Sequence, residues 1–273
     1  MFKDIQEVEF TVFDTETTGL EPESGDRVIE IAAIKLKNHI PGETFHSLVN
    51  PKRKISAAAF AVNHITDEML EKAPAIEEVL PRFLAFVKGT VLCSYNAGFD
   101  FGFLKNEAKV LNMDLPQELV IVDILSMARI LLPQIERHAL WFVAQFFNIE
   151  TIQQHRALSD VELTIKVFNR LNAMLREKGL TDFLQFSSLF GLSCGFLNNV
   201  KERKLSEIQQ AIDLGVKLKI KYFSRSEAKV TERILTPKEI KQENKRDYLI
   251  AYCHLRNGER TFRIDGILHL EIV

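Results

Sequence analysis

The sequence predicts an α/β protein in which a mixed sheet flanked by helices is followed by a small β-rich C-terminal domain. Three strand-like runs come first, and alternating helical and strand-like segments follow them to about residue 178. Short strand-like runs then occupy residues 217–264. The 273 residues exceed the roughly 100–200 of one typical domain, so two domains are expected.

Runs rich in β-branched and aromatic residues predict the strands of the first sheet. The leading three are Glu9–Phe13, Val28–Lys37 and Thr44–Val49, and a Pro41-Gly42 turn signal precedes the third. A fourth, Thr90–Ser94, is short and apolar, as expected of a buried strand. Helices alternate with strands after the third run, which indicates a mixed sheet.

Six segments with helical periodicity predict the helices that cover this sheet. The longest, Ser159–Lys178, has Ser159 as its expected N-cap and Gly179 just past its end. The others are Thr66–Glu71, Ile76–Val87, Phe99–Leu111, Asp123–Leu132 and His138–Phe147. We therefore expect the first domain to span residues 1–178.

The C-terminal third has a different texture. Residues 179–204 are rich in Phe, Ser and Leu without a clear period, and we expect a connector that packs against the protein instead of a solvated tether. Residues 205–273 are expected to form the second domain. Its predicted elements are a short helix, Leu205–Leu214, and antiparallel strands at Lys217–Phe223, Val230–Leu235, Tyr248–His254 and Arg260–Ile264.

Composition and charge exclude several classes of protein. With 46% hydrophobic and 26% charged residues the chain is an ordinary folded protein, and no apolar run approaches the roughly 20 residues of a membrane helix. No apolar signal core follows Met1, so we expect a cytoplasmic protein with no membrane partner. Three widely spaced cysteines, Cys93, Cys194 and Cys253, suggest core residues instead of disulfides or a zinc site.

The net charge of −2 conceals an asymmetry between the two predicted domains. Residues 205–273 carry 13 Lys or Arg and 10 Asp or Glu, a net charge of +3, which leaves −5 on the rest of the chain. A nucleic-acid partner is therefore not indicated by the whole-chain charge, but the basic C-terminal domain is suited to one.

The clearest chemical feature is the pair of acids in Asp14-Thr15-Glu16, at the end of the first predicted strand. Residues two apart on a strand point to the same side. Two like charges so close are unfavourable unless a cation neutralises them, and oxygen ligands suit Mg²⁺ or Mn²⁺. An exposed acidic strand end with no bound ion is the alternative interpretation.

Two more segments place acids at the starts of predicted helices. Asp100 lies at a strand-to-helix junction, and Asp160 lies in the first turn of a helix, five residues after His155. If the fold brings them together, four carboxylates can hold divalent cations. A histidine is suited to deprotonate water near neutral pH, and the alternative for His155 is an ordinary surface histidine.

These three segments resemble, in order, the three motifs of the DEDDh 3'–5' exonucleases, which include the proofreading epsilon subunit of bacterial DNA polymerase III. The segments are Phe13–Leu20, Asn96–Asp100 and the H-x-A-x-x-D pattern of His155–Asp160. The resemblance covers about residues 8–178 and implies a ribonuclease-H-like fold. It implies Asp14, Glu16, Asp100 and Asp160 as ligands of two divalent ions, Mg²⁺ or Mn²⁺, and His155 as the general base.

The same resemblance implies the contacts to the substrate. Thr17 and Thr18 would cradle the terminal nucleotide, Leu20 would wedge against the last base, and Asn96 would hydrogen-bond near the scissile phosphate. Turn formation and strand capping are the alternative for both threonines. The segment Phe60–Thr66 is similar to the family's Val-His-Gly-Ile-Thr stretch, but Asn63 stands where His is common and His64 where Gly is common.

Residues 205–273 resemble a WYL domain. The resemblance is carried by Ile208–Tyr222, Arg233 with Pro237, Tyr248–Cys253 and Arg260–Ile264, although Asp247 stands where the eponymous Trp is expected. It implies contacts to nucleic acid or a nucleotide-like ligand, because guanidinium groups pair with phosphates and aromatic rings stack on bases. The implied residues are Tyr222, Arg233, Tyr248, Arg260 and Arg263; core aromatics and a solvated arginine face are the alternative.

Together these features predict a two-metal 3'–5' exonuclease that shortens nucleic acid from its 3' end and releases nucleoside 5'-monophosphates. Single-stranded DNA is the expected substrate, although the family contains both deoxyribonucleases and ribonucleases. One alternative is a proofreading subunit whose partner is a DNA polymerase, or a nuclease that works with a DNA-repair protein. The other is a nucleic-acid or nucleotide sensor that uses the WYL-like domain.

Overall fold

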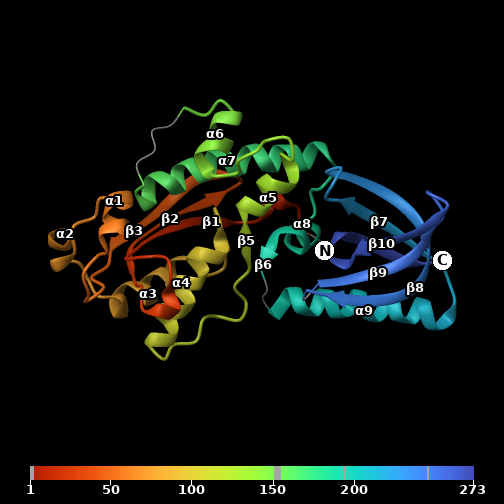
Figure 1. Ribbon diagram of the computed structural model, residues 1–273, viewed down its shortest axis with the longest axis horizontal. Coiled ribbons are helices and arrows are strands. Elements are labelled where there is room, and N and C mark those ends of the chain that lie inside the picture. The colour runs from red at the N-terminus through yellow and green to blue at the C-terminus, as the bar shows by residue number, and fades with distance from the viewer. Residues whose placement is uncertain (1–2, 151–154, 193–194, 245) are drawn as a thin grey trace.

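The computed structural model describes residues 3–150, 155–192, 195–244 and 246–273. Figure 1 shows a mixed sheet with its helices at one end of the molecule and a second sheet, lined by one long helix, at the other. The predicted fold class, a helix-flanked mixed sheet followed by a small β-rich domain, is confirmed. No helix in the described part of the chain has the length and apolar character that crossing a membrane requires.

The first sheet has the strand order β3-β2-β1-β4-β5-β6. Strand β1 pairs antiparallel with β2 and parallel with β4, and β4 pairs parallel with β5. The strands are β1 (Phe10–Thr17), β2 (Val28–Lys37), β3 (Ile40–Leu48), β4 (Val91–Ser94), β5 (Ile121–Asp123) and β6 (Gly191–Leu192). The parallel strands β1 and β4 therefore end at the same edge, which is where Asp14, Glu16 and Asp100 lie.

Alternation along the central strands sends apolar side chains to both faces of this sheet. Phe10 and Val12 of β1 face one core, which α5, α6, α7 and α8 cover, whereas Phe13 faces the other core, which α3 and α4 cover. Near-continuous apolar strands of this kind are expected for a sheet buried on both faces. The helices are α1 (Ala57–Asn63), α2 (Asp67–Glu71), α3 (Ile76–Phe86), α4 (Ala97–Val110), α5 (Ile124–Leu131), α6 (Leu140–Phe146), α7 (Ala157–Glu177) and α8 (Phe183–Phe190).

The start of α7 differs from the prediction. The helix begins at Ala157, with Arg156 as its N-cap, so the expected N-cap Ser159 lies inside the first turn. The N–H of Ala157 is instead bonded by the carboxylate of Glu30 on β2. A distant side chain thus satisfies a helix terminus that a local serine was expected to satisfy.

The second sheet is antiparallel, with the order β10-β9-β8-β7-β11. Its strands are β7 (Leu218–Ser224), β8 (Lys229–Glu243), β9 (Arg246–Cys253), β10 (Gly258–Arg263) and β11 (Ile267–Ile272). Strand β8 runs past the predicted end at Leu235 because Pro237 is accommodated next to a shift in register. Helix α9 (Gly195–Leu214) begins ten residues before the predicted helix and packs Ile208 and Ala211 on this sheet.

The two sheets are joined by a shared apolar cluster. Phe223, Ala228 and Leu268 of the second sheet belong to the same core as Phe186 and Phe190 of α8. Arg225 also donates from Nη2 to the carbonyl of Leu189, 3.0 Å away. Segment 183–190 of the predicted connector therefore packs between the sheets, while the exact bounds of the domains and the connector stay predictions.

Two of the predicted core cysteines, Cys93 and Cys253, are free and buried. The third, Cys194, lies outside the described residues. Burial raises the pKa of the Cys93 thiol well above its ordinary value, so this side chain behaves as a small apolar group.

Candidate functional site

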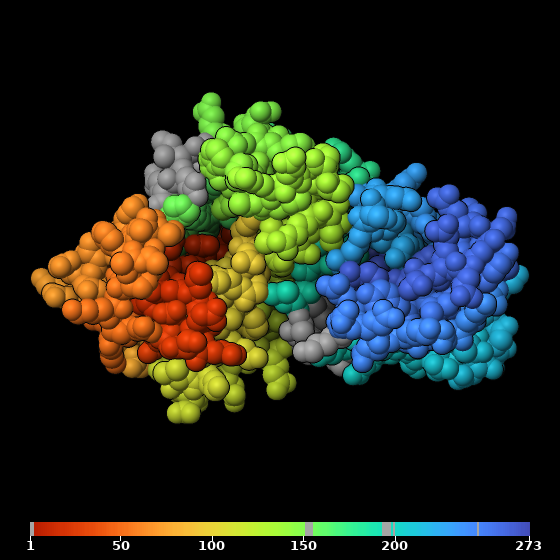
Figure 2. Space-filling model, viewed as in Figure 1, coloured from red at the N-terminus to blue at the C-terminus, as the bar shows by residue number. Residues whose placement is uncertain are grey.

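Three acidic side chains from distant parts of the sequence converge at the carboxyl edge of the first sheet. Asp14 and Glu16 come from the end of β1, and Asp160 comes from the first turn of α7. One carboxylate oxygen from each lies within 4.8 Å of the others. In Figure 2 a hollow opens on this side of the molecule, with the dark red of β1 in its floor and the yellow of α4 at its rim. Oxygen donors at this separation can hold a hard divalent cation.

Asp100 lies behind this group, in the first turn of α4, and is buried. Its Oδ1 accepts hydrogen bonds from the backbone N–H and the hydroxyl of Thr15, at 2.9 and 2.7 Å, and Oδ2 accepts one from the Ser94 hydroxyl. Burial is the main cause of the raised pKa of Asp14, and the charge of Asp100 is the largest contribution from a neighbouring acid, so Asp100 acts on the group. The structure therefore brings three of the four predicted acids together and places the fourth against them.

The acids of this site hold their protons more tightly than ordinary carboxyls. Burial, followed by the charges of Asp160, Glu30 and Asp100, raises the pKa of Glu16 to about 8. Burial raises the pKa of Asp100 to about 6, although the bonds from Ser94 and Thr15 oppose the rise. The pKa of Asp14 and that of Asp160 also rise, in each case mainly through burial. Such mutual repulsion is what a bound cation relieves.

His155 lies two residues before the start of α7, with its backbone in the left-handed region at a φ of 47°. The positive charge of a protonated His155 would partly offset the rise in the pKa of Asp160 that burial causes. The imidazole and this carboxylate therefore lie within electrostatic reach. The predicted base and the predicted ligands thus occupy the same end of α7.

The predicted substrate residues lie around the turn after β1 and at the start of α4. The Thr17 hydroxyl donates to the carbonyl of Gly19 at 2.5 Å, and the Thr18 hydroxyl donates to Asp26 at 3.0 Å, so both hydroxyls shape this turn. A Cβ on Gly19 would collide with the carboxyl group of Asp26. The Leu20 side chain is 74% exposed at the tip, and Asn96 is exposed at a φ of 72°.

The sequence interpretation missed side chains that support the acids. Asn63 hydrogen-bonds Glu16 and opposes the rise in its pKa, and it also donates to the carbonyl of Thr17 at 3.4 Å. Glu30 is fully buried on β2 and binds Arg156. A single acid inside the otherwise apolar run Val28–Ile34 was the available signal for Glu30.

In the second domain the five nominated residues do not share one surface. Arg233 is 8% exposed, and its guanidinium lies 5.8 Å from the Tyr222 ring centroid. Arg263 is bound to Asp265, with Nε 3.0 Å from Oδ1. Arg260 and Arg263 are three positions apart on β10. Because side chains alternate along a strand, the two arginines point to opposite faces of the sheet.

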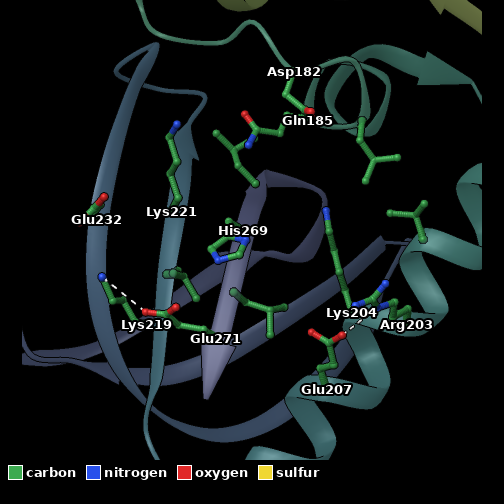
Figure 3. A pocket seen from close by; sticks show the side chains of 15 residues that line it. Asp182, Gln185, Arg203, Lys204, Glu207, Lys219, Lys221, Glu232, His269 and Glu271 are labelled. Atoms are coloured by element: carbon green, nitrogen blue, oxygen red, sulfur yellow. Dashed lines mark hydrogen bonds and ion pairs between the residues drawn. The ribbon is translucent and has the colours of Figure 1, made fainter. Parts of the chain in front are cut away.

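A cavity of about 680 Å³ lies between α8, α9 and the edge formed by β7 and β11 (Figure 3). Its lining includes four Lys or Arg and four Asp or Glu, so the carboxylates balance the cations. Two of the cations are in ion pairs, Arg203 with Glu207 at 2.8 Å and Lys219 with Glu271 at 3.4 Å. The cavity is separate from the acidic cluster and has no net charge that would select an anion.

Comparison with family models gives two matches. The model described as "Exonuclease" (RNase_T) matches residues 11–168, which include all the acids and the histidine described above. The model described as "WYL domain" matches residues 203–272, which cover the second sheet.

Curated relatives share the first of these regions. A "DNA polymerase III PolC-type" of Caldanaerobacter subterraneus subsp. tengcongensis is 39% identical over 183 residues, covering 67% of this chain and 13% of that relative. A "DNA polymerase III subunit epsilon-like protein" of Rhodobacter capsulatus is 39% identical over 185 residues, covering 66% of this chain and 26% of that relative. The chain thus spans about an eighth to a quarter of the length of these relatives.

Solved structures share the fold at low identity. Exonuclease I of Methylocaldum szegediense is 17% identical with a TM-score of 0.59, and the match covers 96% of this chain and 64% of that one. Exonuclease I of E. coli in complex with a dA16 oligonucleotide is 16% identical with a TM-score of 0.59, covering 97% and 63%. The nuclease domain of 3'hExo bound to rAMP is 18% identical with a TM-score of 0.56, covering 66% and 97%. The likeness to exonuclease I thus includes the second sheet.

Proposed function

Because the chain belongs to the exonuclease family and carries a C-terminal WYL domain, we propose that it hydrolyses nucleic acid from the 3' end and releases nucleoside 5'-monophosphates. The observation that carries the proposal is the convergence of Asp14, Glu16 and Asp160 within 4.8 Å, with Asp100 against them. These acids, together with His155, are the residue types that metal-assisted phosphodiester hydrolysis requires.

Asp14, Glu16, Asp100 and Asp160 are the proposed ligands of two divalent ions, Mg²⁺ or Mn²⁺. The donor set fits, since it is all oxygen, and a bound cation would lower the pKa values that burial and neighbouring acids raise. When bound, the ions would stabilise the charge that develops on the attacking and leaving oxygens. Asn63 would keep Glu16 oriented by its hydrogen bond to that carboxylate.

His155 is the proposed general base, which takes the proton of the attacking water. Histidine is the side chain best suited to accept a proton near physiological pH. Asp160 lies within electrostatic reach of His155, and its negative carboxylate would stabilise the positive charge of the imidazolium that forms.

The 3'-terminal nucleotide is proposed to bind across the turn after β1. The exposed Leu20 would wedge against the last base, while Thr17, Thr18 and Asn96 would contact the sugar and phosphate. We propose single-stranded DNA as the main substrate. Proteins of the same fold have been solved with dA16 and with rAMP, so the assay should compare both sugars.

The test is a time course with a 5'-labelled single-stranded oligonucleotide and Mg²⁺ or Mn²⁺. A ladder that shortens one nucleotide at a time, with nucleoside 5'-monophosphate as the product, is the expected result. Circular single-stranded DNA is the control, because an exonuclease leaves it intact. An intact linear substrate in both metals would overturn the proposal and favour a nucleic-acid sensor.

Tyr222, Arg233, Tyr248, Arg260 and Arg263 are the proposed contacts of the WYL domain to nucleic acid. The support is Arg233, whose buried guanidinium bonds Thr231 at 3.0 Å and Cys253 at 3.8 Å and has no carboxylate ion partner among the described residues. A buried cation without an acid is costly, and a phosphate would compensate it.

The double variant Arg260→Ala with Arg263→Ala is expected to bind single-stranded nucleic acid more weakly. The slope of log affinity against log salt concentration should also become shallower by about two, one for each lost phosphate contact. Affinity would be measured by fluorescence anisotropy over a range of salt concentrations with a catalytically inactive chain. Lys238→Ala with Lys241→Ala removes the same charge from strand β8, outside the proposed contacts, and is the control. Equal slopes for the two variants would contradict the proposed contacts.

A proofreading role beside a DNA polymerase is the second candidate function. The favouring observation is 39% identity to a PolC-type polymerase over 183 residues. A tagged chain should then retain a polymerase through purification at moderate salt. Retention of a DNA-repair protein without a polymerase would instead indicate a repair nuclease.

A further inference from the structure

Glu30 is a fully buried acid in strand β2, and its neighbours from Val28 to Ile34 are all apolar. It lies on β2 directly opposite Glu16 of β1 in the strand register, and α7 packs across both strands (Figure 1). Burying a carboxylate is costly unless it is paired and hydrogen-bonded. The groups that hydrogen-bond Glu30 must therefore compensate the cost of its burial.

Four donors converge on this carboxylate. Arg156 binds it in a bidentate manner, with Nη2 2.7 Å from Oε1 and Nε 3.1 Å from Oε2. The N–H of Ala157 donates to Oε2 at 3.1 Å, and Nε2 of His46 lies 2.7 Å from Oε1. Burial would raise the pKa of Glu30, but the bonds from Arg156, His46 and Ala157 outweigh it and lower the pKa, so the group stays charged.

These bonds hold the two residues that directly follow His155. Arg156 occupies the N-cap position of α7, but its side chain makes no capping hydrogen bond. The carboxylate of Glu30 accepts the first helical N–H, that of Ala157, instead. The left-handed backbone of His155, at a φ of 47°, is uncommon for a residue with a side chain and persists only where the surroundings enforce it. The chain after His155 is thus fixed by a carboxylate 127 positions earlier.

A second buried glutamate shows the same chemistry at a different place. Glu107 of α4 is 1% exposed, binds Arg27 through Nε at 2.9 Å and Nη2 at 2.6 Å, and accepts the N–H of Val28 at 3.0 Å. This pair fixes the start of β2, and in the part of the chain that the structure describes it makes no hydrogen bond or ion pair with Arg156 or Ala157. It allows the general stability of a buried Glu–Arg pair to be separated from an effect on His155.

We propose that Glu30 is a positioning residue that, through Arg156 and the N–H of Ala157, sets the imidazole of His155 for proton transfer. The inference rests on the proposed function, because it concerns the base of that reaction. Small misplacements of a catalytic group are costly, and a shift of about 1 Å can reduce a rate by about 10²-fold. Glu30→Gln keeps the shape but removes the charge that binds Arg156.

The experiment is a double-mutant cycle with Glu30→Gln and His155→Ala, read as kcat and KM on a single-stranded oligonucleotide. Glu30→Gln alone should lower kcat by about 10²-fold with KM within threefold, since the base is misplaced while the substrate surface is intact. In the His155→Ala background the same substitution should lower kcat by less than threefold, because no imidazole is left to position. An equal loss of kcat in both backgrounds would overturn the proposal.

Two further measurements separate an effect on the position of His155 from a general loss of stability. Glu107→Gln should lower the melting temperature to a similar extent but act on KM more than on kcat, since Arg27 borders the Leu20 turn. Arg156→Ala should regain kcat when guanidinium ion is added, and the regained rate should disappear if His155 is also replaced. No rescue of a folded Arg156→Ala chain would count against the proposal. An inactive wild-type chain would instead refute the exonuclease function itself.

Discussion

Asp14→Asn is expected to reduce 3'-end hydrolysis by about 10³-fold or more, because the substitution removes one of the three carboxylates that converge in the acidic cluster. Divalent ions supply several kcal/mol of transition-state stabilisation, and each 1.36 kcal/mol is tenfold in rate. Asn has nearly the same shape but no charge to hold a cation. The rate of shortening of a 5'-labelled oligonucleotide at saturating Mg²⁺ or Mn²⁺ measures the effect.

The same variant should not lose stability. Burial opposes the ionised form of Asp14, and the neighbouring acids oppose it further, so a neutral side chain removes an unfavourable charge from the metal-free protein. We expect the melting temperature without metal to stay level or rise while activity disappears. Asp114→Asn, which neutralises an exposed acid remote from the cluster, is the matched control and should keep its activity. A tenth or more of the wild-type rate in Asp14→Asn would refute the role of this carboxylate.

Much of this site follows from short-range features of the sequence. Asp14 and Glu16 share a face because strand side chains alternate, and β1 and β4 end together because they are parallel, which brings Asp100 near. The mixed sheet followed from the order of strand-like and helical segments. The grouping of Asp14, Glu16 and Asp160 within 4.8 Å agrees with what the pattern of acids indicates, while their roles as metal ligands stay a prediction.

Other features depend on contacts that no local pattern encodes. Glu30 and Arg156 are 126 positions apart in the sequence. The capping rule considers only residues next to the helix start, so it could not identify Glu30 as the group that caps α7. Strand β5 has only three residues, too few for a period, and β11 follows β10 through the short turn Ile264–Gly266. The strand predicted to end at Leu235 continues to Glu243 as β8, because a register shift after Pro237 preserves its pairing with β9. Tertiary pairing decided each of these.

Stability of the metal-free protein is expected to fall as the pH rises from 5 to 8. Glu16 has a pKa of about 8 in the folded protein against an ordinary value of 4.5, so folding favours its protonated form. Its contribution to stability is complete below pH 4.5 and is lost as the pH rises through 8. Asp14, Asp100 and Asp160, whose pKa values are also raised, act in the same direction. The expected decline in melting temperature is about 5 °C or more.

A divalent cation should reverse this decline, because it takes the place of the protons that the carboxylates release. The increase in melting temperature on adding Mg²⁺ or Mn²⁺ is therefore expected to grow from pH 5 to 8, and Glu16→Gln should flatten both curves. The comparison stops at pH 8 because Lys204, whose pKa burial lowers to about 8, opposes the trend above that value. A metal-free melting temperature that is level or rises over this interval would mean that the acids are ionised without a cation, and the case for a metal centre at the edge of β1 would fail.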